Sequence, residues 1–174
     1  MKATVALIRD LQGRILDIGG GGEGVIGRMY GAQVVVIDNR QDELDETPDG
    51  FEKRLMDAAH LTFADETFDA ATAFFSLLYF DQDTLILAVS EAFRVLRPGG
   101  LFCVWDTPIE KADPFIIELE IDAGGIPIHT TYGVYMEAKT QTSESIQEVC
   151  EQAGFRLMEA ADSDTFYHRY QKPV

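Results

Sequence analysis

The segment that decides the fold is Ile15-Leu16-Asp17-Ile18-Gly19-Gly20-Gly21-Gly22-Glu23-Gly24. A short apolar run leads into a glycine cluster, and Val25, Ile26 and Met29 follow at helical spacing. This order predicts a buried strand, a tight turn and a helix. Glycines let a ligand lie against bare backbone, and the first turn of a helix offers free N–H groups. We therefore expect a binding site at this turn.

Strand-like and helix-like segments alternate along the rest of the chain. Apolar, β-branched runs predict strands at 33–37, 53–56, 68–75 and 101–105, and a broad apolar face predicts a helix over 81–96. A second helix is expected over 142–153, followed by strand-like tails at 155–160 and 165–171. This alternation predicts a doubly wound, Rossmann-like α/β fold, with a mostly parallel sheet and an antiparallel C-terminal edge strand.

The length of 174 residues suits a single domain covering 1–174. The rhythm breaks at about 110–138, where apolar and polar residues alternate on both sides of a glycine turn. This pattern predicts an inserted β-hairpin. Its apolar face is too large for an exposed loop, so we expect the hairpin to form either a lid or a homodimer contact.

Charge and composition narrow the partners. The net charge of −16 repels phosphate backbones and anionic membrane surfaces, so we expect neither nucleic acid nor membrane as a partner. No apolar run approaches the ~20 residues of a membrane span, and the first ten residues lack the apolar core of a signal peptide, which predicts a cytoplasmic protein. No His/Cys/Asp cluster suggests a bound metal.

The glycine turn fits two classes of ligand. Gly19, Gly21 and Gly24 match the dinucleotide pattern G-x-G-x-x-G, and Asp38 lies where a carboxylate can bind ribose hydroxyls. One interpretation is therefore an NAD(P)-dependent oxidoreductase. However, Asp17 stands two residues before the first glycine, and a carboxylate there would repel a pyrophosphate and suit a cationic ammonium or sulfonium group.

Five ordered elements within residues 14–106 carry a family resemblance. They are Asp17-x-Gly19-x-Gly21, Asp38, Asp57-Ala58, the segment 61–69 (LTFADETFD) and the segment 94–100 (RVLRPGG). Together they resemble the class I S-adenosylmethionine-dependent methyltransferases, in particular the small-molecule subgroup that includes ubiquinone- and menaquinone-biosynthesis enzymes. The resemblance implies S-adenosylmethionine as cofactor and S-adenosylhomocysteine as product.

The resemblance also implies roles at the methionine end of the cofactor. Asp17 and the backbone of Gly19 and Gly21 would hold the methionine part. Phe75 and Ser76, just past the strand at 68–75, would lie near the transferable methyl group.

At the nucleoside end, Asp38 would bind the ribose hydroxyls. Asp57 would accept a hydrogen bond from the adenine amino group, and Ala58 would donate its backbone N–H to the ring. The chain departs from the family pattern in three places. Glu23 stands where a glycine is common, the short stretch between Asp38 and Phe51 leaves room for only a short second helix, and the N-terminal segment that often covers the site is nearly missing.

The implied reaction is methyl transfer to a small-molecule acceptor by in-line displacement. Such a reaction gains much of its rate from positioning and needs a general base only if the acceptor starts protonated. The sequence identifies no base, and the candidate catalytic residues are His129 in the inserted hairpin and Tyr79 after the fourth strand. Tyr132 and Tyr135 could face an acceptor or a partner subunit. A non-catalytic S-adenosylmethionine-binding module is a further alternative.

Overall fold

The computed structural model describes residues 1–110, 114–134 and 140–174. Its main sheet has the strand order β4-β3-β2-β5-β6-β10-β9. Five of these strands run parallel, namely β2 (Ile15–Ile18), β3 (Val34–Asp38), β4 (Glu52–Leu55), β5 (Phe68–Phe74) and β6 (Leu96–Asp106). β10 (Phe166–Gln171) joins β6 in the antiparallel sense, and β9 (Arg156–Asp162) pairs antiparallel with β10 at the edge. The predicted α/β class is confirmed, and both C-terminal strands lie at the antiparallel end of the sheet.

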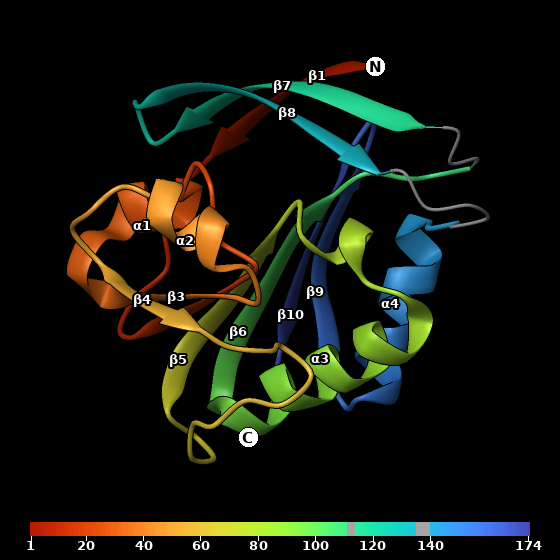
Figure 1. Cartoon of the computed structure of the whole chain (residues 1–174). Helices are drawn as coiled ribbons and strands as arrows, with labels where there is room; N and C mark the ends of the chain where they lie inside the picture. The colour runs from red at the N-terminus through yellow and green to blue at the C-terminus, as the bar shows by residue number, and fades with distance from the viewer. Residues whose placement is uncertain (111–113, 135–139) are drawn as a thin grey trace.

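Helices cover both faces of this sheet (Figure 1). α1 (Val25–Tyr30) and α2 (Gln41–Glu46) lie on one side, and α3 (Gln82–Val95) and α4 (Ser143–Gln152) lie on the other. Two 3₁₀ turns, η1 (Gly31–Gln33) and η2 (Leu77–Tyr79), follow α1 and β5. The expected 81–96 helix begins one residue later because Asp81 is its N-cap, whose side chain accepts from the Thr84 N–H at 2.8 Å.

The buried strands serve two separate cores because successive side chains of a strand point to opposite faces. In β3, Val35 and Ile37 pack in the core beneath α3 and α4, whereas Val34 and Val36 pack in the core beneath α1. The continuous apolar run at 34–37 is therefore the signature of a strand covered on both sides.

A second, three-stranded sheet lies across the top of the molecule in Figure 1. β7 (Phe115–Ala123) and β8 (Pro127–Val134) form the antiparallel hairpin, and β1 (Lys2–Leu7) pairs parallel with β7. The sequence did not predict β1, because its pairing partner lies more than 100 residues away.

The apolar face of the hairpin is covered within the chain itself. Ile117, Leu119 and Ile121 of β7 are buried in the same core as α1, while Glu118 and Glu120 face outward. Because the chain itself buries this apolar face, the hairpin does not need a second copy of the protein to cover it. The expected range of about 110–138 includes residues 111–113 and 135–138, which lie outside the described residues, and Tyr135 is one of them.

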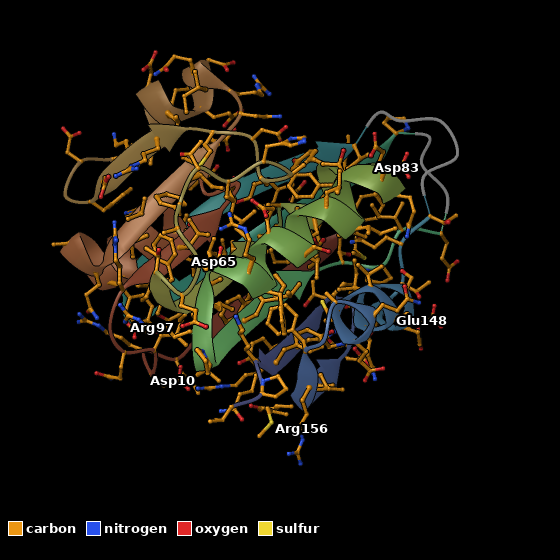
Figure 2. All side chains as sticks on the ribbon, turned by 90° about the horizontal axis from the view of Figure 1, so that it is seen from below. Asp10, Asp65, Asp83, Arg97, Glu148 and Arg156 are labelled. Atoms are coloured by element: carbon orange, nitrogen blue, oxygen red, sulfur yellow. The ribbon has the colours of Figure 1, made fainter. Side chains whose placement is uncertain are left out.

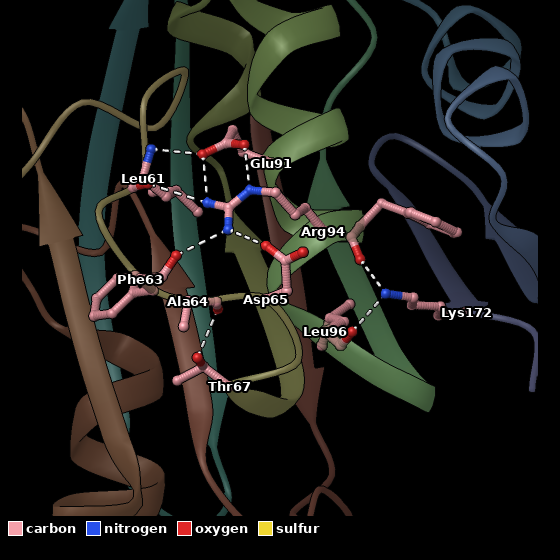
Figure 3. A network of polar contacts seen from close by, with 10 residues as sticks. Leu61, Phe63, Ala64, Asp65, Thr67, Glu91, Arg94, Leu96 and Lys172 are labelled. Atoms are coloured by element: carbon pink, nitrogen blue, oxygen red, sulfur yellow. Dashed lines mark hydrogen bonds and ion pairs between the residues drawn. The ribbon is translucent and has the colours of Figure 1, made fainter.

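Arg94, in the last turn of α3, holds the loop that follows β4 through hydrogen bonds and ion pairs. Figure 3 shows Arg94 donating to the carbonyl oxygens of Leu61 at 3.1 Å and Phe63 at 2.9 Å, and pairing with Glu91 and Asp65. This network fixes the loop that follows β4.

Other charged side chains, such as Glu148 and Arg156, lie on the surface and point away from the sheets (Figure 2). Within the described ranges, no helix is long and apolar enough to cross a membrane.

Candidate functional site

A cavity of about 710 Å³ lies where β2, β3 and β5 end, with the hairpin strand β8 as its opposite wall. The parallel strands place their carboxyl ends at this edge, which is where open α/β sheets bind ligands. All eight residues proposed for the cofactor line it or lie in the turn that borders it: Asp17, Gly19, Gly21, Asp38, Asp57, Ala58, Phe75 and Ser76. The structure thus brings together residues from four separate segments of the chain.

The glycine turn is held close to its neighbours. The N–H groups of Gly19 and Gly20 both donate to the Ile37 carbonyl oxygen, at 2.9 and 3.2 Å. Gly19 has a φ of +67°, and a Cβ added there would lie 2.6 Å from the Cβ of Ser76. A Cβ at Gly20 would collide with the Asp17 carboxylate. Gly19 therefore needs both the backbone freedom and the small size of glycine, whereas Gly20 only has to leave room for the Asp17 carboxylate. The two glycines form one wall of the cavity.

Asp17 is a buried carboxylate beside that turn. Its side chain is 1 % exposed and accepts a hydrogen bond from the Thr72 hydroxyl at 2.7 Å. Burial raises the pKa of Asp17 to about 7, because a charge is costly away from water. No lysine, arginine or histidine of the described residues pairs with it. Such a carboxylate is suited to a cationic ligand group, which would relieve this cost.

Asp38 and Asp57 lie on the side of the cavity formed by β3 and β4. Asp38 accepts from the N–H groups of Gly21 at 3.2 Å and Arg40 at 3.0 Å. Asp57 accepts from the Ala59 N–H at 2.9 Å, and its other oxygen lies 3.0 Å from the His60 ring nitrogen. The His60 hydrogen bond and the Ala59 N–H lower the pKa of Asp57. Both carboxylates are thus oriented by backbone contacts and can still accept from ligand hydroxyl or amino groups.

The hairpin closes the cavity through three contacts. The Thr130 and Tyr132 hydroxyls both donate to the Glu23 carboxylate, the latter at 3.2 Å. The Tyr132 ring stacks on Phe75 with centroids 5.7 Å apart and an interplanar angle of 12°. β8 is therefore fastened to both sides of the cavity mouth, as expected for a lid.

In the sequence alone, Glu23 stands out only as a departure from the family pattern and has no assigned role. Its function as an anchor for β8 depends on Thr130 and Tyr132, which are more than 100 residues away. One signal was available: the alternation along β8 places Ile128, Thr130, Tyr132 and Val134 on a single face.

The two candidate catalytic residues differ in position. Tyr79 lines the cavity. His129 does not, because it points to the opposite face of β8, where it is exposed and stands across from Glu120 of β7. It lines a separate hollow of about 600 Å³ on the outer surface of the small sheet. The strand period of two thus carries His129 away from the site that its neighbours Thr130 and Tyr132 help to build.

The chemistry of these residues fits S-adenosylmethionine. The buried Asp17 carboxylate can pair with an ammonium group, the glycine cradle admits backbone contact, and Asp38 and Asp57 can accept from hydroxyl and amino donors. A pyrophosphate fits poorly, because Asp17 and Asp38 flank the turn with negative charge.

Comparison with known proteins gives the same result. The family model described as "Methyltransferase domain" matches residues 16–104. The ubiquinone/menaquinone biosynthesis C-methyltransferase UbiE of Desulfotalea psychrophila is 34 % identical over 109 residues, covering 57 % of this chain and 44 % of that protein. The O-methyltransferase cnsE of Penicillium expansum is 27 % identical over 85 % of this chain and 54 % of its own. The chain spans about half the length of these curated relatives.

Solved structures share the fold. The PH0226 protein of Pyrococcus horikoshii superposes with a TM-score of 0.70 at 18 % identity, over 93 % of this chain and 84 % of that one. A methyltransferase from Methanosarcina mazei gives 0.70 at 18 % identity, over 94 % and 95 %. The [4+2]-cyclase SpnF gives 0.65 at 20 % identity, over 94 % and 77 %. The fold therefore also occurs in a protein described as a cyclase, and the family assignment rests on the sequence match.

The family match covers the glycine turn, Asp38, Asp57 and the strand that ends at Phe74, and it does not favour the oxidoreductase alternative. The chain belongs to the methyltransferase-domain family, the class I S-adenosylmethionine-dependent methyltransferases.

Proposed function

We propose that this chain binds S-adenosylmethionine in the cavity and transfers its methyl group to a small-molecule acceptor. The observation that carries the proposal is that one cavity joins the glycine turn and its carboxylates to an aromatic wall supplied by the lid. The first wall suits the cofactor, and the second leaves room for an acceptor.

Each cofactor residue has a defined task in this proposal. Asp17 pairs with the α-ammonium group, Asp38 accepts from the ribose hydroxyls, and Asp57 with the Ala58 N–H reads the adenine. When bound, the cofactor supplies a methyl group made electrophilic by a sulfonium. Phe75 and the lid residue Tyr132 exclude water from that methyl group. Holding an acceptor in line with it can lower the barrier by up to ~7–11 kcal/mol in favourable cases.

The enclosure favours a small acceptor. β8 closes one side of the cavity, and curated relatives are named for a ubiquinone/menaquinone C-methylation, an O-methylation and a sterol C-methylation. Burial raises the pKa of Tyr79 to about 12, so its hydroxyl keeps its proton at neutral pH and acts as a hydrogen-bond donor rather than a base. The cytoplasmic location stays a prediction of the sequence.

A thermal-shift comparison of S-adenosylmethionine, S-adenosylhomocysteine, NAD and NADP tests the cofactor. A ligand at ~100 times its dissociation constant stabilises the folded state by about 2.7 kcal/mol, which should raise the melting temperature by roughly 5–10 °C. A shift with S-adenosylhomocysteine and none with NAD supports the proposal, and a shift with NAD alone refutes it.

Transfer of radioactive methyl label to a metabolite extract then separates an enzyme from a binding module. The existence of a cyclase with this fold makes that second test necessary. Tight cofactor binding without label in any fraction would support the non-catalytic alternative.

A further inference from the structure

The Glu23 carboxylate places a negative charge on the lid side of the cavity. The Glu23 carboxylate accepts hydrogen bonds from the Thr130 and Tyr132 hydroxyls, which are both neutral. Across residues 1–110, 114–134 and 140–174, no lysine, arginine or histidine forms an ion pair with it. Two hydroxyl donors orient the carboxylate without neutralising it.

The rest of the cavity does not supply the missing positive charge. Arg40 is the one cationic side chain among the described residues that line it, and its guanidinium pairs with Asp42 and with Glu43 at 3.2 Å. Bound S-adenosylmethionine brings one net positive charge, since its ammonium and sulfonium outweigh its carboxylate. In the proposed function Asp17 already pairs with the ammonium group, and Asp38 adds a second negative charge to the cofactor side of the cavity. The potential at Glu23 therefore stays negative after the cofactor is in place.

Aromatic rings stand beside this carboxylate. Tyr132 stacks on Phe75 at 5.7 Å, and Tyr79 lines the same cavity. Ring faces attract cations through their quadrupole, and a neighbouring carboxylate adds a direct charge partner. Rings together with an unneutralised carboxylate discriminate in favour of ammonium groups and against phenolates or carboxylates.

We propose that the acceptor is a small amine, which enters as an ammonium ion and is held by Glu23 against the rings of Tyr132 and Tyr79. This inference rests on the proposed function. The ammonium nitrogen gives up a proton to bulk water before it reaches the shielded methyl group, and its freed lone pair then forms the N–C bond to the methyl carbon. The C–S bond breaks with its electron pair going to sulfur, which becomes a neutral thioether. The product is an N-methyl ammonium ion.

The test uses three probes that share one ring and differ in charge: phenethylamine, 2-phenylethanol and 3-phenylpropionate. Each is titrated into the protein saturated with S-adenosylhomocysteine, and binding is measured by calorimetry. We expect phenethylamine to bind at least tenfold more tightly than the alcohol, with the carboxylate weakest. Glu23→Gln should abolish this preference. Glu120→Gln is the matched control, because it removes the same charge from the outer face of the lid.

Three results would overturn the inference. Phenethylamine could bind no more tightly than the alcohol, or the preference for the amine could survive in Glu23→Gln. Glu23→Gln could also weaken only the binding of S-adenosylhomocysteine, which would assign the carboxylate to the cofactor. If Glu23→Gln does not fold, Glu23→Asp keeps the charge but withdraws it by one methylene. It should lower the amine preference at least threefold, and an unchanged preference contradicts the inference. A protein that fails to bind S-adenosylhomocysteine at the outset refutes the proposed function instead.

Discussion

Replacing Asp17 by asparagine should make the ligand-free protein more stable and, at the same time, impair cofactor binding. Asp17 is 1 % exposed, and its pKa is raised by burial from 3.8 to about 7. Between these values the folded protein holds a proton that the unfolded chain has released. The free energy of unfolding therefore falls as pH rises from about 4 to 7 and is constant above that range.

The size of the effect follows from the shift. A difference of about 3 pKa units at about 1.36 kcal/mol each gives roughly 4 kcal/mol of destabilisation above pH 7. The asparagine side chain carries no charge, so Asp17→Asn should recover about 2–4 kcal/mol at pH 8 and raise the melting temperature by roughly 4–16 °C. The same change removes the partner proposed for the cofactor ammonium. Loss of a buried charge pair costs about 3–5 kcal/mol, so affinity should fall at least ~100-fold.

The assay combines thermal melts of wild type and Asp17→Asn from pH 5 to 9 with calorimetric titration of S-adenosylhomocysteine. Wild-type affinity should also weaken below pH 7, because protonated Asp17 loses its charge, and this dependence should vanish in the variant. A variant that is less stable than wild type at pH 8 would show that burying the Asp17 charge does not destabilise the folded protein. Unchanged ligand affinity would show that Asp17 does not face the ammonium group.

Four further substitutions test separate parts of the structure. Asp38→Ala removes the acceptor proposed for the ribose hydroxyls, so S-adenosylhomocysteine should bind about 10–100-fold more weakly by calorimetry, and equal affinity would refute the role. Gly20→Ala places a Cβ against the Asp17 carboxylate, so binding in the same assay should weaken at least ~10-fold although the backbone tolerates alanine there. Arg94→Ala breaks its hydrogen bonds to two loop carbonyls, which should cost about 2–3 kcal/mol in denaturant unfolding, and an unchanged midpoint would contradict this. Burial lowers the pKa of His168 from 6.5, so the unfolded chain takes up a proton at this histidine more readily than the folded protein does. The free energy of unfolding therefore falls as pH falls below about 6.5. The fall in melting temperature between pH 7 and 5 should therefore be smaller in His168→Gln.

The main sheet could be predicted because its signals are local. The apolar run at 34–37 has the period and β-branching of a strand covered on both faces, and the glycine turn after Ile18 marks a strand–helix junction whatever lies around it. The cofactor wall could be predicted for a related reason. Asp17, Asp38 and the pair Asp57–Ala58 each lie at or just after the end of a strand, and parallel strands end at one edge.

The lid could be predicted only in part. Alternation indicated the hairpin, but β1 has no local mark that distinguishes it from an exposed tail, and its pairing with β7 is a contact over 100 residues of chain. His129 does not line the cavity, although the sequence made it a candidate. Which residues of a strand face inward depends on the side on which the core lies. That side is set by the packing of Ile117, Leu119 and Ile121 on α1.

By itself, then, the sequence determined the α/β class, the glycine turn and the carboxylates at the ends of the parallel strands, because periodicity and turn chemistry act between near neighbours. Only the tertiary structure decided that β8 closes the cavity and that Glu23 meets Thr130 and Tyr132. It also decided that Asp17 loses contact with water. Burial and lid closure arise from distant segments meeting in space, and the charge of a carboxylate has consequences only once its surroundings are known.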